Sequence, residues 1–531
     1  MDVASRARAM PSINFNVLAI PTVADWGPMN EATVVVDWSD YTEKFGGLLA
    51  SYEGPLQVKR FFDLGGRRAV IVRVCHVTSH VASSTPATAL KATHSFKTAV
   101  GGGYSAVNTL RVDGLYYGSK GNNLSVAIAT ASNGSASYFD LLVYYNDVLS
   151  EWYQNMSMDS TDANYVEDVI NTKSSKSKWI AVTDLDISTL ASDKMPTTIV
   201  AQDLTGGNDG LTGLVDADYL GATNYHTGLN ALNLVQDGDM LIVPDKASST
   251  SFINNVITWL DSVKHGKVLL ITDTPANSDK AGAAAHETAL TATEYRTGAY
   301  WPGIKISNPD KTIYGQADTV TIRTSGSAAG RYAKNAQTEK TQMWSQPGNP
   351  FMGWLDGASG LETDSVKEPS VRDYVTPYKI NPVMSGFRED GAFGVWLDDV
   401  QLGRKDFNFK SIGEGRGVCY LRKLFELYLE RHRTQNNTEE RRESIKLDME
   451  AELLKHMEMG AFINKDASDA FYVNTDPEGK GLNNPLVQDD ETLRVLVAVA
   501  TARAARLVQL MFTRDSRAIE SYIQQQLAAN S

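Results

Sequence analysis

The stretch that decides the fold is residues 238–273, GDMLIVPDKASSTSFINNVITWLDSVKHGKVLLITD. Its two ends, 238–244 and 267–273, are apolar runs without polar alternation, which is typical of strands buried on both faces. Between them, 251–264 places apolar residues at helical spacing along one face. A strand, a helix and a strand within about 35 residues form a βαβ unit with parallel strands. The sequence therefore predicts an α/β domain around this segment.

The same organisation extends towards the N-terminus. Residues 56–62 are amphipathic and end before two glycines, and 69–74, AVIVRV, have the composition of another buried strand. Helix followed by buried strand again indicates α/β structure. Residues 1–14 are small, polar and basic without periodicity, so we interpret them as a flexible arm, with order beginning near Asn16.

The middle of the chain has a different pattern. Residues 77–103 are rich in Ser, Thr, Ala and Gly, which suits a domain boundary. From 107 to 200 the chain shows short strands such as 124–128 and 138–145, separated by turn clusters such as 118–123. This part is predicted to be a β-rich module.

The last part of the chain begins with two amphipathic helices. Apolar stripes at helical spacing cover 421–429 and 445–457, and the second stripe is followed by Gly460, a typical helix stop. Residues 492–499 predict a strand. Helix propensity alone would join 496–512 into one helix, so the pattern leaves 507–513 open between helix and strand.

Composition limits the class of protein. A chain of 531 residues is too long for one hydrophobic core and predicts about two to four domains. The net charge of −13 argues against a broad nucleic-acid-binding surface. Cys75 and Cys419 are too few for a disulfide framework, and both are interpreted as small buried residues, with a reactive thiol or a single bridge as the alternative. Neither a signal sequence nor a membrane-spanning run is evident, so we expect a protein kept in the cytoplasm or released by lysis.

No pattern in the chain predicts catalysis or metal binding. The serines in 325–330 and 357–360 do not complete a nucleophile elbow, and spacing ties neither His226 nor His286 to them. The Gly/Asn/Asp cluster at 203–210 is interpreted as a turn, with a calcium site as the alternative. We therefore predict no catalytic residue, no metal and no cofactor, which favours a structural or assembly protein over an enzyme.

An ordered series of motifs resembles the tail sheath proteins of contractile-tailed bacteriophages. The motifs are DWGP (25–28), FGG (45–47), FF (61–62), GG (65–66), VRV (72–74), GSKGNNLSV (118–126), EWYQNMS (151–157), TGGNDG (205–210), DYLG (218–221), AYWP (299–302), SGSAAGRYA (325–333), PGN (347–349), INPV (380–383) and MGA (459–461). Each motif is weak by itself, but the series covers about residues 16–513 in order. The resemblance is therefore carried by the order of the motifs.

The resemblance implies a multidomain α/β fold. It consists of a core α/β domain built from both chain ends, a central α/β domain with a subtilisin-like fold but no activity, and an outer β-rich sandwich or barrel. The expected division is 1–15 N-terminal arm, 16–100 core domain, 101–210 outer β-rich domain, 211–365 central domain, 366–503 core domain again, and 504–531 C-terminal strand and tail.

The resemblance also implies a function. The chain would be a structural subunit that assembles as stacked hexameric rings around a tail tube, is held in a metastable extended state, and contracts to drive the tube through a host envelope for genome ejection. Its partners would be further copies of itself, the tube protein, and baseplate and tail terminator proteins, without nucleic acid or membrane insertion. Its location would be the virion, after assembly in the bacterial cytoplasm. The alternatives are the sheath of a headless injection particle and an α/β hydrolase.

In such sheaths, terminal strands of one subunit complete a sheet in its neighbours. The residues expected to be donated are Leu507, Val508, Gln509, Leu510, Met511 and Phe512 near the C-terminus, and Ser12, Ile13, Asn14 and Phe15 near the N-terminus. This resemblance favours a strand over a helix for 507–513. Lys446 and Lys455 are the candidates to face an acidic tube, with an ordinary solvated helix face as the alternative.

Overall fold

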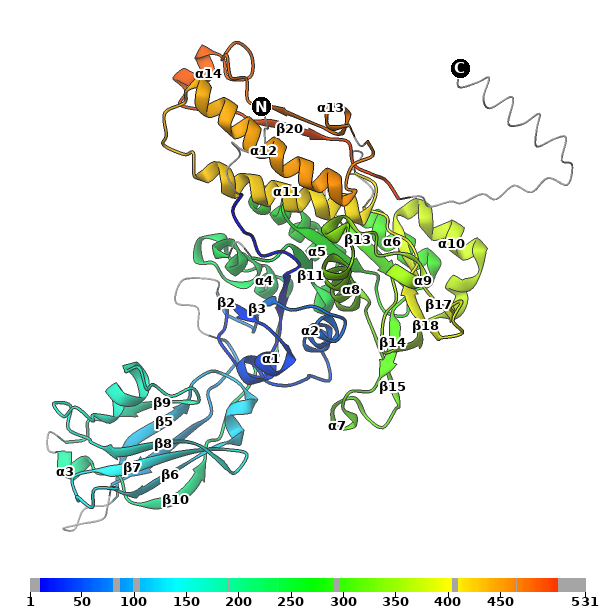
Figure 1. The fold of residues 1–531 in the computed structure, drawn as a ribbon. Coiled ribbons are helices and arrows are strands. Elements are labelled where there is room, and N and C mark those ends of the chain that lie inside the picture. The colour runs from blue at the N-terminus through cyan, green and yellow to red at the C-terminus, as the bar shows by residue number, and fades with distance from the viewer. Residues whose placement is uncertain are drawn as a thin grey trace, which may run out of the picture.

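The structure is a computed structural model, and it describes residues 10–79, 86–98, 106–188, 191–235, 237–290, 297–403, 409–464 and 466–504. Three parts are visible in Figure 1: a large α/β body, a β-rich module at one end, and a helical C-terminal unit at the other. Within the described residues no helix is long and apolar enough to cross a membrane.

The body is built on an eight-stranded sheet. Its spatial order is β18 (Phe393–Leu397), β17 (Ile380–Phe387), β13 (Thr297–Trp301), β12 (Leu269–Asp273), β11 (Met240–Ile242), β1 (Leu18–Thr22), β3 (Ala69–Arg73) and β2 (Ala32–Val35). The strands from β17 to β3 run parallel, and the two outer strands pair antiparallel. Parallel pairing of β11 with β12 confirms the predicted βαβ unit.

Helices cover both faces of this sheet, which explains why its strands are almost continuously apolar. Alternate residues of β1, β3, β11 and β12 enter opposite cores: Ile271 joins one cluster and Leu270 the other. The first face is packed by α2 (Gly54–Asp63) and α8 (Ser325–Thr338), and the second by α5 (Thr250–Trp259). The predicted strand at 69–74 and the helices at 56–62 and 251–264 are therefore confirmed, although 260–264 is a π-helical turn.

This sheet draws its strands from three of the expected ranges of the chain. It takes strands from 16–100, from 211–365 and from 366–503, so these ranges share one pair of cores. The strand near Val72 belongs to this sheet, whereas the strand near Val497 belongs to a separate two-stranded sheet. These two strands therefore lie in different sheets, although 16–100 and 366–503 both contribute strands to the large one. β1 pairs parallel with β3 on one side and with β11 on the other, and so joins the N-terminal strands to those of the central segment.

The β-rich module contains two antiparallel sheets around one core. One sheet has the order β10 (Ile199–Asp203), β6 (Leu124–Thr130), β7 (Phe139–Tyr145) and β8 (Val148–Met156), and the other has the order β4 (Thr93–Lys97), β5 (Asn108–Gly114) and β9 (Ile180–Asp184). Trp26, from the loop after β1, inserts its ring into this core. The predicted strand-rich character of 107–200 is confirmed.

The C-terminal unit, residues 411–504, contains a helix pair and a small sheet. Its elements are α11 (Ile412–Glu430), α12 (Glu439–Met459), α13 (Ala467–Ala470), β19 (Phe471–Asn474), α14 (Pro485–Asp489) and β20 (Leu496–Val499). Both predicted helices are confirmed, and Gly460 ends α12 in the left-handed conformation with φ 88°. The predicted strand at 492–499 is shorter and begins at Leu496.

The remaining elements decorate the body. They are α1 (Trp38–Phe45), α4 (Asp216–Leu220), α6 (Lys280–Ala289), α7 (Lys311–Tyr314), α9 (Asn349–Met352), α10 (Pro369–Val375) and the antiparallel strands β14 (Ile304–Ser307), β15 (Thr319–Ile322) and β16 (Ala358–Leu361), with α3 (Ala191–Lys194) in the β-rich module.

Candidate assembly site

The small sheet of the C-terminal unit has an unpaired edge. β19 and β20 pair antiparallel, with Tyr472 opposite Ala498, and the described residues add no third strand. The amide of Ala500 donates to the carbonyl of Ala470 at 2.8 Å. Since backbone groups alternate in direction along a strand, those of Val497 and Val499 point away from β19. Such an edge is a ready template for another strand.

An apolar groove of about 870 Å³ lies beside this edge. Its lining residues are Phe409, Val418, Leu421, Arg422, Phe425, Glu426, Leu429, Met449, Ile463, Arg503 and the run 495–501. The groove is therefore formed by β20 on one side and by α11 on the other. A strand added to β20 would place its side chains against a preformed apolar surface, which is the usual source of specificity in strand addition.

The chain leaves the described structure at the rim of this groove, from a firmly held position. The hydroxyl of Thr501 donates to Glu414 Oε1 at 2.5 Å, and the amide of Ala502 donates to the carbonyl of Ala461 at 2.9 Å. Glu414 also closes the capping box of α11 with Ser411. One buried carboxylate thus fixes both the start of α11 and the root of the C-terminal segment. The expected donor residues 507–512 lie outside the described residues.

The N-terminal donor candidates lie along α11 of their own subunit. The Phe15 ring meets the Tyr420 ring edge-on at 5.1 Å, and Ile13 packs against the core of the C-terminal unit. Asn14 donates from its side chain to Asp237 at 3.3 Å. Ser12 is exposed. Donation of residues 12–15 to a neighbour therefore requires these contacts to break. The apolar pair Ile13 and Phe15 is the one feature of the arm's sequence that indicates them.

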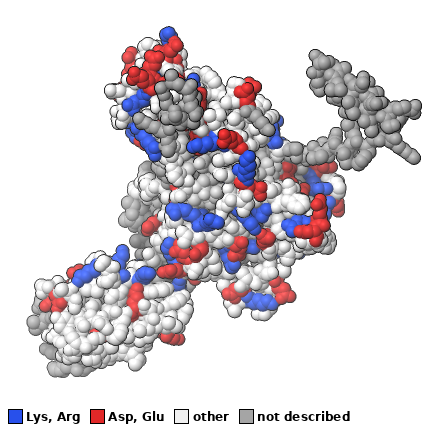
Figure 2. Space-filling model, viewed as in Figure 1, with Lys and Arg blue, Asp and Glu red and all other residues white. Residues whose placement is uncertain are grey.

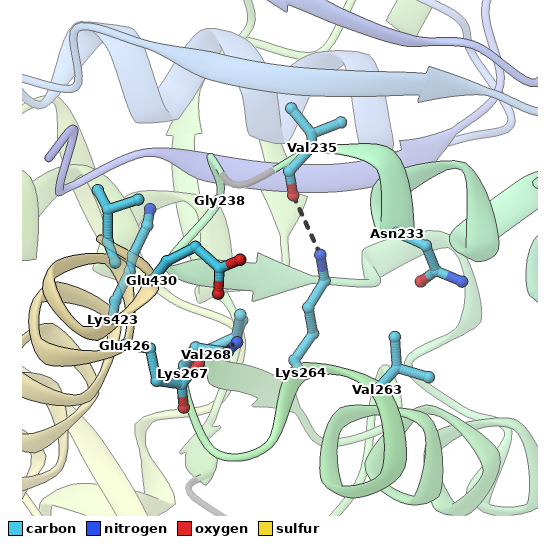
Figure 3. A pocket seen from close by; sticks show the side chains of 11 residues that line it. Asn233, Val235, Gly238, Val263, Lys264, Lys267, Val268, Lys423, Glu426 and Glu430 are labelled. Atoms are coloured by element: carbon cyan, nitrogen blue, oxygen red, sulfur yellow. Dashed lines mark hydrogen bonds and ion pairs between the residues drawn. The ribbon is translucent and has the colours of Figure 1, made fainter. Parts of the chain in front are cut away.

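A charged pocket of about 390 Å³ lies beside the arm, between α11 and the turn before β12 (Figure 3). Three lysines line it. Lys264 donates to the carbonyls of Leu232 and Val235, and Lys267 pairs with Glu426 at 2.6 Å. Burial, and then the charges of Lys267 and Lys423, lowers the pKa of Lys264 to about 8. Since glutamates from α11 also line the pocket, its charge is nearly balanced and it acts as a polar brace between helix and sheet.

The two tube-facing candidates are both ion-paired along α12. Lys446 lies 4.0 Å from Glu450, and Lys455 lies 2.6 Å from Glu452. Acidic side chains also gather at the end of the C-terminal unit around α14, where the exposed run 489–491 lies (Figure 2). The β-rich module, in contrast, shows few charged side chains on the face drawn there. Neighbouring glutamates therefore neutralise much of the charge that these lysines would offer to a partner.

The place where an open parallel sheet usually binds a ligand is filled by the protein itself. That place is the carboxyl end of the strands where the strand order reverses, here between β1 and β11. Asp245 follows β11, and its carboxylate accepts hydrogen bonds from the Gly54 amide and the Thr22 hydroxyl, both at 2.8 Å. Asp273, at the end of β12, likewise accepts from the amides of Thr324 and Ser325. These carboxylates hold the N-termini of α2 and α8 in place of a ligand.

Two of the serines considered for catalysis have other partners. Ser327 accepts a hydrogen bond from Arg60 Nε, and Ser359 donates to the carbonyl of Lys305, both at 3.3 Å. Asp209, in the cluster at 203–210, accepts from the amide and hydroxyl of Ser119. Within the described ranges there is no group of three or more His, Cys, Asp or Glu residues placed to hold a metal ion. The 203–210 cluster is a connection with single β-bridges at Thr205 and Asn208, and its Asp209 carboxylate is used internally.

Solved structures with the same arrangement are sheath proteins. The sheath tail protein of Listeria innocua aligns over 90% of this chain and 91% of its own, with a TM-score of 0.58 and 15% identity. A sheath tail protein of Desulfitobacterium hafniense covers 88% and 92%, with a TM-score of 0.54 and 13% identity. The chain has the tail sheath fold. The expected resemblance is confirmed at the level of the fold.

A subunit of a solved helical assembly has the same fold. The contracted helical sheath of the anti-feeding prophage covers 96% of this chain and 95% of its own, with a TM-score of 0.54 and 12% identity. These three structures are structural sheath proteins and not enzymes. No protein-family model and no curated protein matches the chain. The sheath fold is therefore recognised here from the shape of the chain over most of its length.

Proposed function

We propose that this chain is the self-assembling sheath subunit of a contractile tail. Copies stack as hexameric rings around a tail tube, in an extended state held by a kinetic barrier, and contract to drive the tube through a host envelope. The observation that carries the proposal is the open edge of β20 beside the apolar groove, in a chain with the sheath fold. Such an edge is unfavourable in a monomer and useful in a polymer.

Strand addition is the proposed link between copies. Residues 507–512 of one subunit pair with β20 of another, and their apolar side chains enter the groove. About five ladder bonds at roughly 0.5–1.5 kcal/mol each give several kcal/mol per link. The Glu414–Thr501 contact would set the direction in which the donated segment leaves the subunit, because it fixes the chain three residues before the described part ends. The N-terminal residues 12–15 are proposed to contribute a second strand after release from α11.

Disulfide trapping between two differently tagged copies tests this link. Val497→Cys in one copy and Leu510→Cys in the other are expected to cross-link between tags under mild oxidation, because Val497 lies on the open edge. Native Cys75 and Cys419 are buried and give a low background. The matched control pairs Leu510→Cys with Tyr472→Cys, which lies on β19, the other strand of the small sheet. Equal yields for both pairs, or cross-links only within one tag, contradict the proposed pairing.

The other partners follow from this role. A tube protein would meet the α11–α12 side, with Lys446 and Lys455 as the proposed contacts, and baseplate and terminator proteins would cap the two ends of the sheath. The location is then the virion, after assembly in the bacterial cytoplasm. A headless injection particle would use the same subunit mechanics, and two of the sheath assemblies that share the fold come from an anti-feeding prophage and an extracellular contractile injection system. The presence of heads on purified particles would indicate a phage, and their absence a headless injection particle.

A further inference from the structure

The β-rich module is seated on the body by side chains that cross in both directions. Trp26 of the body enters the module core, and Lys120 of the module donates to the carbonyl of Thr42 at 2.8 Å. That carbonyl belongs to the last turns of α1, where the helix dipole favours a cation. Arg73, at the end of β3, donates to the carbonyl of Tyr117 at 2.6 Å. We call this contact surface, formed by Trp26, Lys120, Arg73 and their partners, the seat of the module.

Asp25 lies in the middle of this seat, in an environment that disfavours its charge. A Cβ added at Gly118 of the module would lie 2.0 Å from the carbonyl oxygen of Asp25, so the module and the body touch there. The Asp25 carboxylate lies against Gly46, at the negative C-terminal end of α1. Its Oδ1 is buried and has no hydrogen-bond partner among the described residues, and Oδ2 has only a 3.5 Å contact with the Gly47 amide.

The charged and titratable groups that face Asp25 come from both sides of the seat. Asp209, on the chain returning from the module, repels it; Lys120 from the module and Arg73 from the body attract it. Tyr41 of α1 lies close, and its hydroxyl is also buried without a described partner. Burial first, and then Asp209, raises the pKa of Asp25 to about 6, despite the two cations and the Gly47 amide. Ionisation of Asp25 near neutral pH therefore destabilises the seat.

We propose that Asp25 is a proton-operated latch that holds the β-rich module on the body. Protonation removes the repulsion between Asp25 and Asp209 across the seat and lets the Asp25 carboxyl donate a hydrogen bond, so the module is held more tightly in mild acid. Ionisation at neutral pH loosens the seat. The latch sets how freely the module changes its orientation on the body, independently of how subunits assemble.

The direction and size of the pH effect on the seated state follow from the linkage between protonation and seating. Asp25 binds its proton more tightly in the seated state than in an opened, hydrated state, so acidification favours the seated state. With a seated pKa of about 6 and an ordinary one near 3.8, moving from pH 7.5 to pH 5.5 favours the seated state by about fourfold. Amide exchange of residues 118–120, corrected for the intrinsic pH dependence of exchange, measures this ratio against the amides of β12 as an internal reference.

The wild-type chain is expected to show the fourfold rise in protection, and Asp25→Asn is expected to show none. Asp147→Asn, an exposed position on the module, is the matched control and keeps the rise. Asp209→Asn removes the repulsion, so its rise is smaller and its midpoint lies at lower pH; this variant tests the latch even if Asp25→Asn does not fold. Protection that is independent of pH in the wild type, or an equal rise in Asp25→Asn, overturns the proposal.

Discussion

The ammonium of Lys423 on α11 donates a hydrogen bond to the carbonyl oxygen of Asn14, 3.1 Å away and 409 positions earlier in the chain. The next residues of the arm are held as well, since Asp239 accepts from the amides of Asn16 and Val17 at 3.0 and 2.7 Å. Arg416 of α11 donates to Asn16 Oδ1. The helical C-terminal unit therefore fixes the root of the N-terminal arm, and any release of residues 12–15 begins by opening this contact.

Lys423→Met is expected to free the arm without unfolding the body. The substitution keeps most of the aliphatic stem and removes the donor to Asn14, a loss of about 1–2 kcal/mol for a part-buried charged donor. Amide exchange at residues 14–15 is predicted to rise by about five- to thirtyfold, while exchange in β12 stays unchanged. Lys455→Met, on the exposed side of α12, serves as the control and should leave the arm protected.

Glu414→Ala is expected to weaken both α11 and the root of the C-terminal segment. Glu414 accepts from the Ser411 amide and hydroxyl and from Thr501, so its loss leaves several buried donors unpaired, at a cost of about 2–3 kcal/mol. Thr501→Val removes only the second contact and is predicted to lower the melting temperature less. An equal loss in both variants would show that the capping box contributes nothing.

Stability is expected to rise as the pH falls from 8 to 6. Burial, only partly offset by Arg323, raises the pKa of Glu53 to about 7, and burial raises that of Asp273 to about 6. A carboxyl whose pKa is raised by folding binds more protons in the native state, so acidification stabilises the fold until the pH nears the unfolded pKa values of about 4. Thermal unfolding across this range tests the sign.

Glu53→Gln is predicted to flatten part of that pH dependence. In the wild type, the Arg323 backbone amide donates to the Glu53 carboxylate at 2.8 Å. The side-chain oxygen of the glutamine can still accept this hydrogen bond, but the side chain carries no charge. Glu443→Gln, at an exposed position of α12, is the matched control and should leave the slope unchanged. A fold that becomes steadily less stable from pH 8 to 6 in the wild type contradicts the assignment of these carboxyls.

Gly417→Ala is expected to destabilise the C-terminal unit. A Cβ at this position of α11 would lie 2.2 Å from the Trp344 ring, which is itself packed against α12 through His456. Overpacking of this kind costs about 1–3 kcal/mol. Gly47→Ala, where a Cβ meets nothing within 4 Å, is the control. Equal melting temperatures for the two variants would mean that α11 shifts freely on Trp344.

Much of the fold was predictable because its signals are local. The runs at 69–74 and 267–273 identify buried strands, and the stripes in α11 and α12 identify helices that pack on one face. Pairing was not predictable in the same way. Whether β1 pairs with β11 or with a C-terminal strand depends on direction and neighbours far apart in the chain, and apolar composition is the same for both choices.

The assembly site was predictable only in part. The apolar run 507–513 predicts which segment would be donated, but the proposed acceptor edge on β20 depends on the absence of a third strand in the described part of the small sheet. The Glu414–Thr501 contact joins residues 87 positions apart. The role of Glu414 at the start of α11 is visible in the sequence, because Ser411 and Glu414 have the spacing of a capping box. Its contact with Thr501 is not.

The central claim is that this chain polymerises through its C-terminal segment. Negative-stain electron microscopy of the purified full-length protein, at rising concentration and salt, tests it most directly beside a variant that lacks residues 504–531. We predict long hollow tubes with a regular helical lattice for the full-length chain, in a contracted form because no tube protein is present. The truncated chain is predicted to remain folded and monomeric. Normal tubes from the truncated chain, or monomers from the full-length chain even with tube protein added, would contradict the account.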